Sequence, residues 1–147
     1  MQHHPRMMAD VNGDGKADVV GFANSGVQVS LSDGARFFAP EKWVSAYGVN
    51  TGGWSVSHHP RMLSDVNGDG KADVIGFSNS GPYVALKYEG ATAFKTPVNY
   101  SNAFGGSQSH GGWNMSHHPR MMADVNGDGR SDVVGFANSG VFVGLAN

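Results

Sequence analysis

Short runs of alternating apolar and polar residues, separated by glycine-rich turns, extend along the whole chain. Such alternation over about four to eight residues is typical of half-buried β-strands. In the middle of the chain it predicts strands at residues 60–65, 73–78 and 82–87, and a weaker one at about 94–100. Residues 79–81 have the composition of a tight turn between the second and third strands. The pattern therefore predicts antiparallel strands joined in chain order.

This pattern occurs three times. Residues 3–31, 58–86 and 117–145 align without gaps, and the first and third copies differ at only four positions. A long repeat made of strands and turns favours a propeller blade. The predicted fold class is all-β: a β-propeller of four-stranded antiparallel blades, about 2.5–3 per chain. We expect one propeller segment over residues 1–147, with repeats 3–57, 58–116 and 117–147, the last lacking its fourth strand.

Two or three blades are too few to close a ring. An open stack would leave blade faces and strand edges exposed to solvent. We therefore expect the ring to be closed by homo-oligomerisation. A homodimer with about six blades is favoured, and a homotrimer with about nine is the alternative.

Composition narrows the class of partner. Twenty-two glycines and only 15% charged residues favour short strands over helices. The net charge of −2 and the pI near 6.3 give no reason to expect nucleic acid as a partner. No apolar run approaches the roughly 20 residues of a membrane span, so no membrane partner is expected. No signal peptide precedes His3.

Residues 65–73 form an acidic loop that recurs at 10–18 and 124–132. Carboxylate or amide oxygens stand at positions one, three, five and nine, and a glycine at position six permits a sharp turn. This spacing predicts a structural Ca²⁺ site, with the carbonyl of position seven as a further ligand. The predicted ligands are Asp10, Asn12, Asp14, Lys16, Asp18, Asp65, Asn67, Asp69, Lys71, Asp73, Asp124, Asn126, Asp128, Arg130 and Asp132. The alternative is a metal-free hairpin loop held by Asx turns.

A second cluster precedes the first strand of each later repeat. Sugar pockets combine an aromatic face with planar hydrogen-bonding groups, and this segment supplies both. The predicted sugar-binding residues are Tyr47, Trp54, His58, His59, Arg61, Asn79, Trp113, His117, His118, Arg120 and Asn138. Alternatively, the tryptophans pack between blades and the arginines bond to backbone carbonyls. Adjacent histidines in an extended chain point to opposite sides, so at most one of each pair should face a shared pocket.

Residues 65–77 resemble the FG-GAP or VCBS repeat of integrin-alpha-like propellers. The longer stretch 54–84, with its His-Pro-Arg and Asn-Ser-Gly motifs, is similar to the PVL-type propeller lectins of fungi and their bacterial relatives. The resemblance implies six- or seven-bladed rings with shallow pockets between blades for N-acetylglucosamine, sialic acid or fucose. It also implies an extracellular or secreted location. This chain is much shorter than such a ring.

The predicted function is therefore a multivalent carbohydrate-binding protein, with repeated weak sites acting together. The first alternative is a calcium-stabilised adhesion or scaffold module that binds protein, and the second is a designed propeller fragment without a dedicated ligand. No serine lies in a nucleophile motif, so an enzyme is not expected. Hairpin turns alternate between the two ends of an up-and-down sheet. This alternation places the acidic loops at the opposite end from the sugar-binding candidates.

Overall fold

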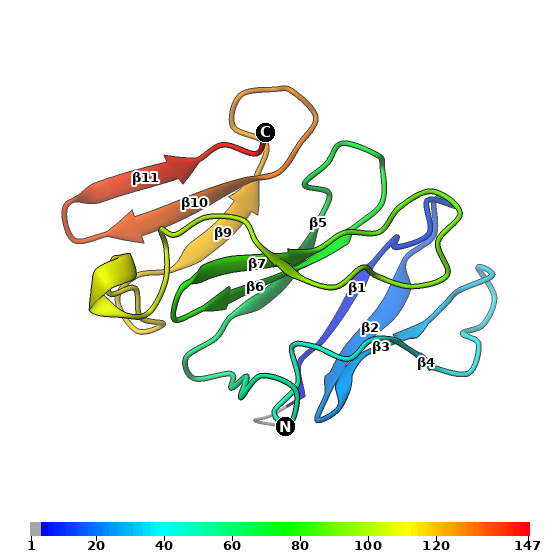
Figure 1. Ribbon diagram of the computed structural model, residues 1–147. Helices are drawn as coiled ribbons and strands as arrows, with labels where there is room; N and C mark the ends of the chain where they lie inside the picture. The colour runs from blue at the N-terminus through cyan, green and yellow to red at the C-terminus, as the bar shows by residue number, and fades with distance from the viewer. Residues whose placement is uncertain (1–3) are drawn as a thin grey trace.

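The computed structural model describes residues 4–147, and these form three antiparallel β-sheets (Figure 1). The first sheet contains β1 (Arg6–Ala9), β2 (Asp18–Ala23), β3 (Gly26–Ser30) and β4 (Glu41–Val44). The second contains β5 (Arg61–Ser64), β6 (Asp73–Ser78), β7 (Gly81–Ala85) and β8 (Val98–Asn99). The third contains β9 (Arg120–Ala123), β10 (Asp132–Ala137) and β11 (Gly140–Gly144). The predicted all-β fold is confirmed.

Strand order in each sheet follows chain order, so each sheet is an up-and-down meander. Tight turns join β2 to β3, β6 to β7 and β10 to β11, where the sequence predicted them. The fourth strand of the second sheet is shorter than expected, because β8 covers only Val98–Asn99. Pro97, which comes just before it, has no amide hydrogen to donate to a neighbouring strand. A short 3₁₀ turn, η1 (Gln108–His110), lies in the connection to the third sheet.

The three sheets pack face against face, and their first strands lie side by side, with β5 next to both β1 and β9 (Figure 1). Val20, Phe22 and Val74 belong to the core between the first and second sheets. Ile75 and Phe77 belong to the core between the second and third. Because β6 alternates between these two cores, five of its six residues are buried. This radial stacking is the arrangement of propeller blades.

The acidic loops of neighbouring sheets are joined by backbone hydrogen bonds. The Ala72 amide donates to the Asp10 carbonyl at 2.8 Å, and the Ser131 amide donates to the Asp65 carbonyl at 2.7 Å. These loops lie at one end of the sheets, and the glycine-rich connections between sheets lie at the other (Figure 1). The repeat thus separates its acidic end from its connecting end, as the alternation of hairpin turns predicted.

Candidate functional site

Two equivalent pockets lie at the connecting end, one at each junction between sheets. The first, of about 590 Å³, is lined by Tyr47, Trp54, His59, Asn79, Ser80 and Tyr83, among others. The second, of about 540 Å³, is lined by the corresponding Phe104, Trp113, His118, Asn138, Ser139 and Phe142, among others. We call them the Tyr83 pocket and the Phe142 pocket. Seven of the eleven sugar-binding candidates predicted from the sequence line these two pockets.

Aromatic side chains from the connection form the inner wall of each pocket. In the first, Tyr47 is fully buried and Trp54 is 9% exposed. A Cβ added to Gly76 would lie 2.6 Å from the Trp54 ring, so this glycine lets the indole lie flat against β6. The Tyr47 hydroxyl donates to the backbone carbonyls of Val74 and Tyr83. These largely buried aromatic residues therefore hold the sheets together and also line the pocket.

One histidine of each adjacent pair faces a pocket, as the sequence predicted. His59 and His118 line the Tyr83 and Phe142 pockets. Their neighbours His58 and His117 line a separate hollow near Trp113. Each pair is therefore divided between two hollows, although residues 56–58 and 115–117 form turns rather than extended chain.

The His59 ring is fixed by the start of the same segment. The Ser55 amide donates to His59 Nδ1 at 3.2 Å, so Nδ1 is the acceptor and Nε2 carries the hydrogen in the neutral ring. Burial lowers the pKa of His59, and the nearby His58 and Arg61 lower it further. The ring is therefore neutral near pH 7 and presents one N–H donor.

Arg61 and Arg120, the first residues of β5 and β9, do not line the two pockets. Arg61 is 4% exposed and donates to the Tyr47 carbonyl at 3.0 Å, and its guanidinium lies 5.4 Å from the centre of the Phe22 ring. Arg120 donates in the same way to the Phe104 carbonyl. Burial lowers the pKa of Arg120 to about 10 and also lowers the pKa of Arg61. The structure thus gives both arginines the structural role that was the alternative to sugar contact.

Tyr83 and Phe142 are among the pocket residues that the sequence analysis did not predict. Tyr83 pairs with Gly76 across the β6–β7 ladder, and Phe142 pairs with Gly135 across β10–β11, so both side chains lie on the pocket side of their sheets. The corresponding residue in the first repeat is Gln28. Positions 28 and 142 are one of the four differences between otherwise identical repeats. That variation was the available signal, because the packing positions do not vary in this way.

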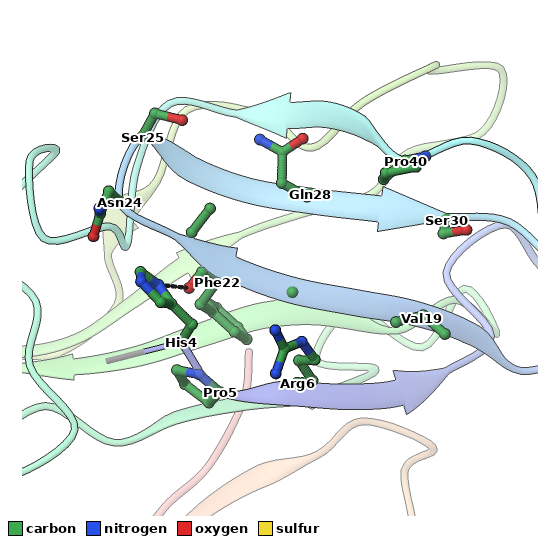
Figure 2. Close-up of a pocket in the computed structure, with 12 residues that line it drawn as sticks. His4, Pro5, Arg6, Val19, Phe22, Asn24, Ser25, Gln28, Ser30 and Pro40 are labelled. Carbon is green, nitrogen blue, oxygen red and sulfur yellow. Dashed lines mark hydrogen bonds between the residues drawn. The ribbon is translucent and has the colours of Figure 1, made fainter. Parts of the chain in front are cut away.

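A third hollow lies on the outer face of the first sheet (Figure 2). His4, Asn24, Ser25 and Gln28 line it, in the positions of His59, Asn79, Ser80 and Tyr83. Within residues 4–147 no tryptophan covers Gly21, and a Cβ added there would have only the Gln28 carbonyl at 4.0 Å. The His4 ring also differs, since its Nδ1 donates to the Phe22 carbonyl at 3.1 Å. This hollow has the polar rim of a pocket without its aromatic wall.

The acidic loops are held by their own hydrogen bonds. Asp65 accepts the amides of Asn67, Gly68 and Asp69 at one carboxylate oxygen and that of Gly70 at the other. Loops 10–18 and 124–132 show closely similar patterns. Asp73 is fully buried and accepts the amides of Val66 and Lys87. These bonds fix the turn and join it to β6 and the end of β7.

The oxygen donors of these loops suit Ca²⁺ by type. Both oxygens of Asp65 accept backbone N–H groups, and the oxygen that accepts the Gly70 amide keeps a further lone pair. Among residues 4–147 no three histidine, aspartate or glutamate side chains come together as a metal site would require. Calcium binding at these loops therefore stays a prediction.

The chain was compared with known proteins. Residues 65–135 match the FG-GAP-like repeat. An Agrocybe aegerita lectin, described as specifically recognising non-reducing terminal N-acetylglucosamine, shares 40% identity with a TM-score of 0.92 over 100% of this chain. A TcdB2–TccC3–Cdc42 complex matches 97% of this chain at 20% identity with a TM-score of 0.70, and so supports the fold alone. No curated protein sequence matches.

The fold and the comparisons define the class: a segment of β-propeller that matches the FG-GAP-like repeat over residues 65–135 and is similar to a propeller-type lectin. This chain spans 36% of the length of the lectin chain and 6% of the chain matched in the complex. The narrower PVL-type assignment rests on the sequence resemblance. In the described part of the chain no helix is long and apolar enough to cross a membrane.

Proposed function

We propose that this protein binds carbohydrate, with the Tyr83 and Phe142 pockets as its sugar sites and terminal N-acetylglucosamine as the first candidate ligand. The observation that carries the proposal is the pair of equivalent pockets between sheets, in a chain 40% identical over its full length to a lectin that recognises this sugar. Fucose and sialic acid are the other candidates. The proposed activity is binding, without catalysis.

The pocket chemistry suits a sugar ring. Neutral His59 carries a donor at Nε2 and interacts with the Asn79 side chain, whose exposed amide has both donors and acceptors for hydroxyl or acetamido groups. Tyr83 and Phe142 supply the aromatic surface against which the apolar side of a pyranose packs. Phe142 is 47% exposed, so its ring is accessible to a ligand. His118 and Asn138 repeat the polar pair at the second site.

Two shallow sites on one chain give the protein modest affinity at each site and added strength on a surface that carries many sugars. We propose that this multivalency increases further by self-association, with two copies favoured over three. Four pockets would then face a glycan-coated surface together. In this proposal, the repeated pockets increase the overall affinity of the protein for such a surface.

A glycan array with the full chain tests the proposal. We expect saturable signal on glycans with terminal N-acetylglucosamine that free N-acetylglucosamine abolishes. The double variant His59→Ala/His118→Ala should lose this signal. The matched control is His58→Ala/His117→Ala, which changes the neighbouring histidines outside both pockets and should keep it. No signal on N-acetylglucosamine, fucose or sialic acid glycans would overturn the proposal.

A further inference from the structure

The exposed face of the third sheet carries several large apolar side chains. We call it the third-sheet outer face. Its apolar residues are Met121, Val125, Phe136, Val141 and Val143, and they are 56%, 49%, 39%, 60% and 48% exposed. The repeat places Phe22, Val27 and Val29 at the positions of the last three, and there they are at most 1% exposed because the second sheet covers them. The same three residue types are thus buried in one sheet and open in another.

The opposite end of the stack presents the matching surface. Arg6, Gly21 and Gln28 lie in register across β1, β2 and β3, and Met8, Val19 and Ser30 lie in the neighbouring row on the same side. We call this side the first-sheet outer face. In the second sheet the corresponding side, which includes Val74 and Gly76, packs against the first sheet. Met8 is 58% exposed, whereas its counterpart Leu63 packs against the core.

Polar contacts at the two junctions give the register. Arg61 lies over the Phe22 ring at 5.4 Å, and Arg120 lies over the Phe77 ring at 5.2 Å. Arg6 is equivalent to Arg61 and Arg120, and Phe136 is equivalent to Phe22 and Phe77. The same contact between two chains would therefore place Arg6 of one chain over Phe136 of the other. It would also bring the Ala17 amide to the Asp124 carbonyl, as Ala72 meets Asp10 and Ser131 meets Asp65. Both apolar and polar positions are therefore complementary in one orientation.

We infer that the third-sheet outer face docks onto the first-sheet outer face of a second copy of this chain, head to tail, in the same geometry that joins the first two sheets. The second copy is the occupant that the surfaces favour, because it carries both halves of a junction already present twice in the structure. This docking would also cover the third-sheet outer face and so prevent nonspecific aggregation through it. The inference concerns chain association and does not depend on which ligand the pockets hold.

Sedimentation velocity on the full chain at several concentrations measures the association. We expect a species of at least twice 15.4 kDa, the mass of one chain. Val141→Glu/Val143→Glu should give a monomer, and so should Met8→Glu, which alters the opposite face. All three side chains are exposed within the chain, so its near-ultraviolet circular dichroism should be unchanged. Val98→Glu, at an exposed position on the outer strand β8, is the matched control and should associate normally.

A mixing experiment tests the head-to-tail orientation. Met8→Glu chains keep an intact third-sheet outer face, and Val141→Glu/Val143→Glu chains keep an intact first-sheet outer face. An equimolar mixture should therefore form a heterodimer although each variant alone is a monomer. A monomeric wild-type chain at about 100 µM, a dimer that survives either variant, or a mixture that stays monomeric would each overturn the inference.

Discussion

Gly76 and Gly21 occupy the same position in successive repeats but have opposite surroundings. Gly76 lies under the Trp54 and Tyr47 rings, which a Cβ would approach at 2.6 and 2.7 Å. Gly21 has open space at that side, with the nearest atom at 4.0 Å. Neither glycine has a positive φ, so the comparison isolates steric contact from backbone strain. Glycine usually weakens a strand, but at position 76 its missing side chain leaves room for the Trp54 and Tyr47 rings.

We expect Gly76→Ala to lower the free energy of unfolding by about 1–3 kcal/mol, because the added methyl group must displace Trp54 or the strand. Gly21→Ala is the matched control and should be neutral or slightly stabilising, because alanine reduces the freedom of the unfolded chain. Urea denaturation followed by tryptophan fluorescence measures both. Equal effects of the two substitutions would show that Trp54 does not lie against Gly76.

The buried carboxylate of Asp73 gives a second prediction at this scale. Asp73 accepts two backbone amides, from Val66 and from Lys87 at 2.7 Å. In Asp73→Asn the side-chain NH₂ group must face one of these N–H donors, so we expect a loss of about 1–3 kcal/mol in unfolding free energy. Asp69→Asn, in the exposed part of the same loop, is the control and should cost less. Denaturant titration of both variants tests the difference.

The titration of Asp73 predicts a pH dependence. Burial raises the pKa of Asp73 from 3.8 to about 7 in the folded chain. Between these values the folded chain binds the proton that the unfolded chain has released, so this group makes stability fall as pH rises. His59, whose pKa is lowered, acts in the opposite direction. The slope due to Asp73 is therefore the difference between wild type and Asp73→Asn from pH 4 to 7, and its absence would contradict the assigned environment.

The sequence predicted part of this residue-level picture. The expectation that at most one histidine of each pair faces a given pocket agrees with the structure, although its premise of an extended chain does not, because residues 56–58 and 115–117 form turns. The sequence could not decide between sugar contact and packing for Arg61 or Trp54, since both residues come from one repeat and pack on another. Their burial depends on the position of Phe22 and Gly76 across a junction between sheets. The residue pattern of one repeat does not show where Phe22 or Gly76 of another sheet will lie.

At the scale of elements, the acidic loop and the connection have separate tasks. The loop closes the hairpin between the first two strands of each sheet and bonds to the next loop through Asp10 and Asp65. The connection supplies the aromatic wall and the pocket histidine. The repeated acidic motif is the most legible feature of the sequence, but it lies at the end of the sheets away from the pockets (Figure 1). The hydrogen bonds of the acidic loop therefore stabilise the hairpin and the contact between neighbouring sheets.

Removal of calcium distinguishes the two interpretations of the acidic loops. The metal-free alternative, in which hydrogen bonds around Asp65 hold the loop, predicts the same melting temperature in excess calcium and in excess EGTA, to within about 2 °C. The reason is that the loop amides already satisfy the carboxylate oxygens. Differential scanning calorimetry measures this directly. A melting temperature several degrees higher in calcium would establish the predicted metal site.

At the scale of the whole molecule, the repeat predicted the architecture well, because each unit carries its own strand and turn signals. Three sheets with the expected strand order follow from that periodicity. The pockets could not be predicted in the same way, since each forms between two repeats. The hollow beside Gln28 shows this plainly: it has the local residues of a pocket and lacks the wall that a neighbouring repeat supplies to the other two.

This difference between repeats predicts the number of binding sites. The Tyr83 and Phe142 pockets are walled by Trp54 and Trp113, whereas the hollow beside Gln28 is not. Self-association leaves that hollow without a tryptophan, because the third-sheet outer face contributes none. We therefore expect two sugar molecules bound per chain, in monomer and dimer alike. A stoichiometry of three would show that the polar rim suffices for binding.

Isothermal titration calorimetry with N-acetylglucosamine tests the central claim most directly. The account predicts saturable binding to the wild-type chain at two sites per chain, a loss of at least tenfold in affinity for His59→Ala/His118→Ala, and unchanged binding for His58→Ala/His117→Ala. A tenfold loss corresponds to about 1.4 kcal/mol, the scale of a neutral hydrogen bond in a binding site. Absence of heat with the wild-type chain, or equal losses in both double variants, would contradict the claim that these pockets bind sugar.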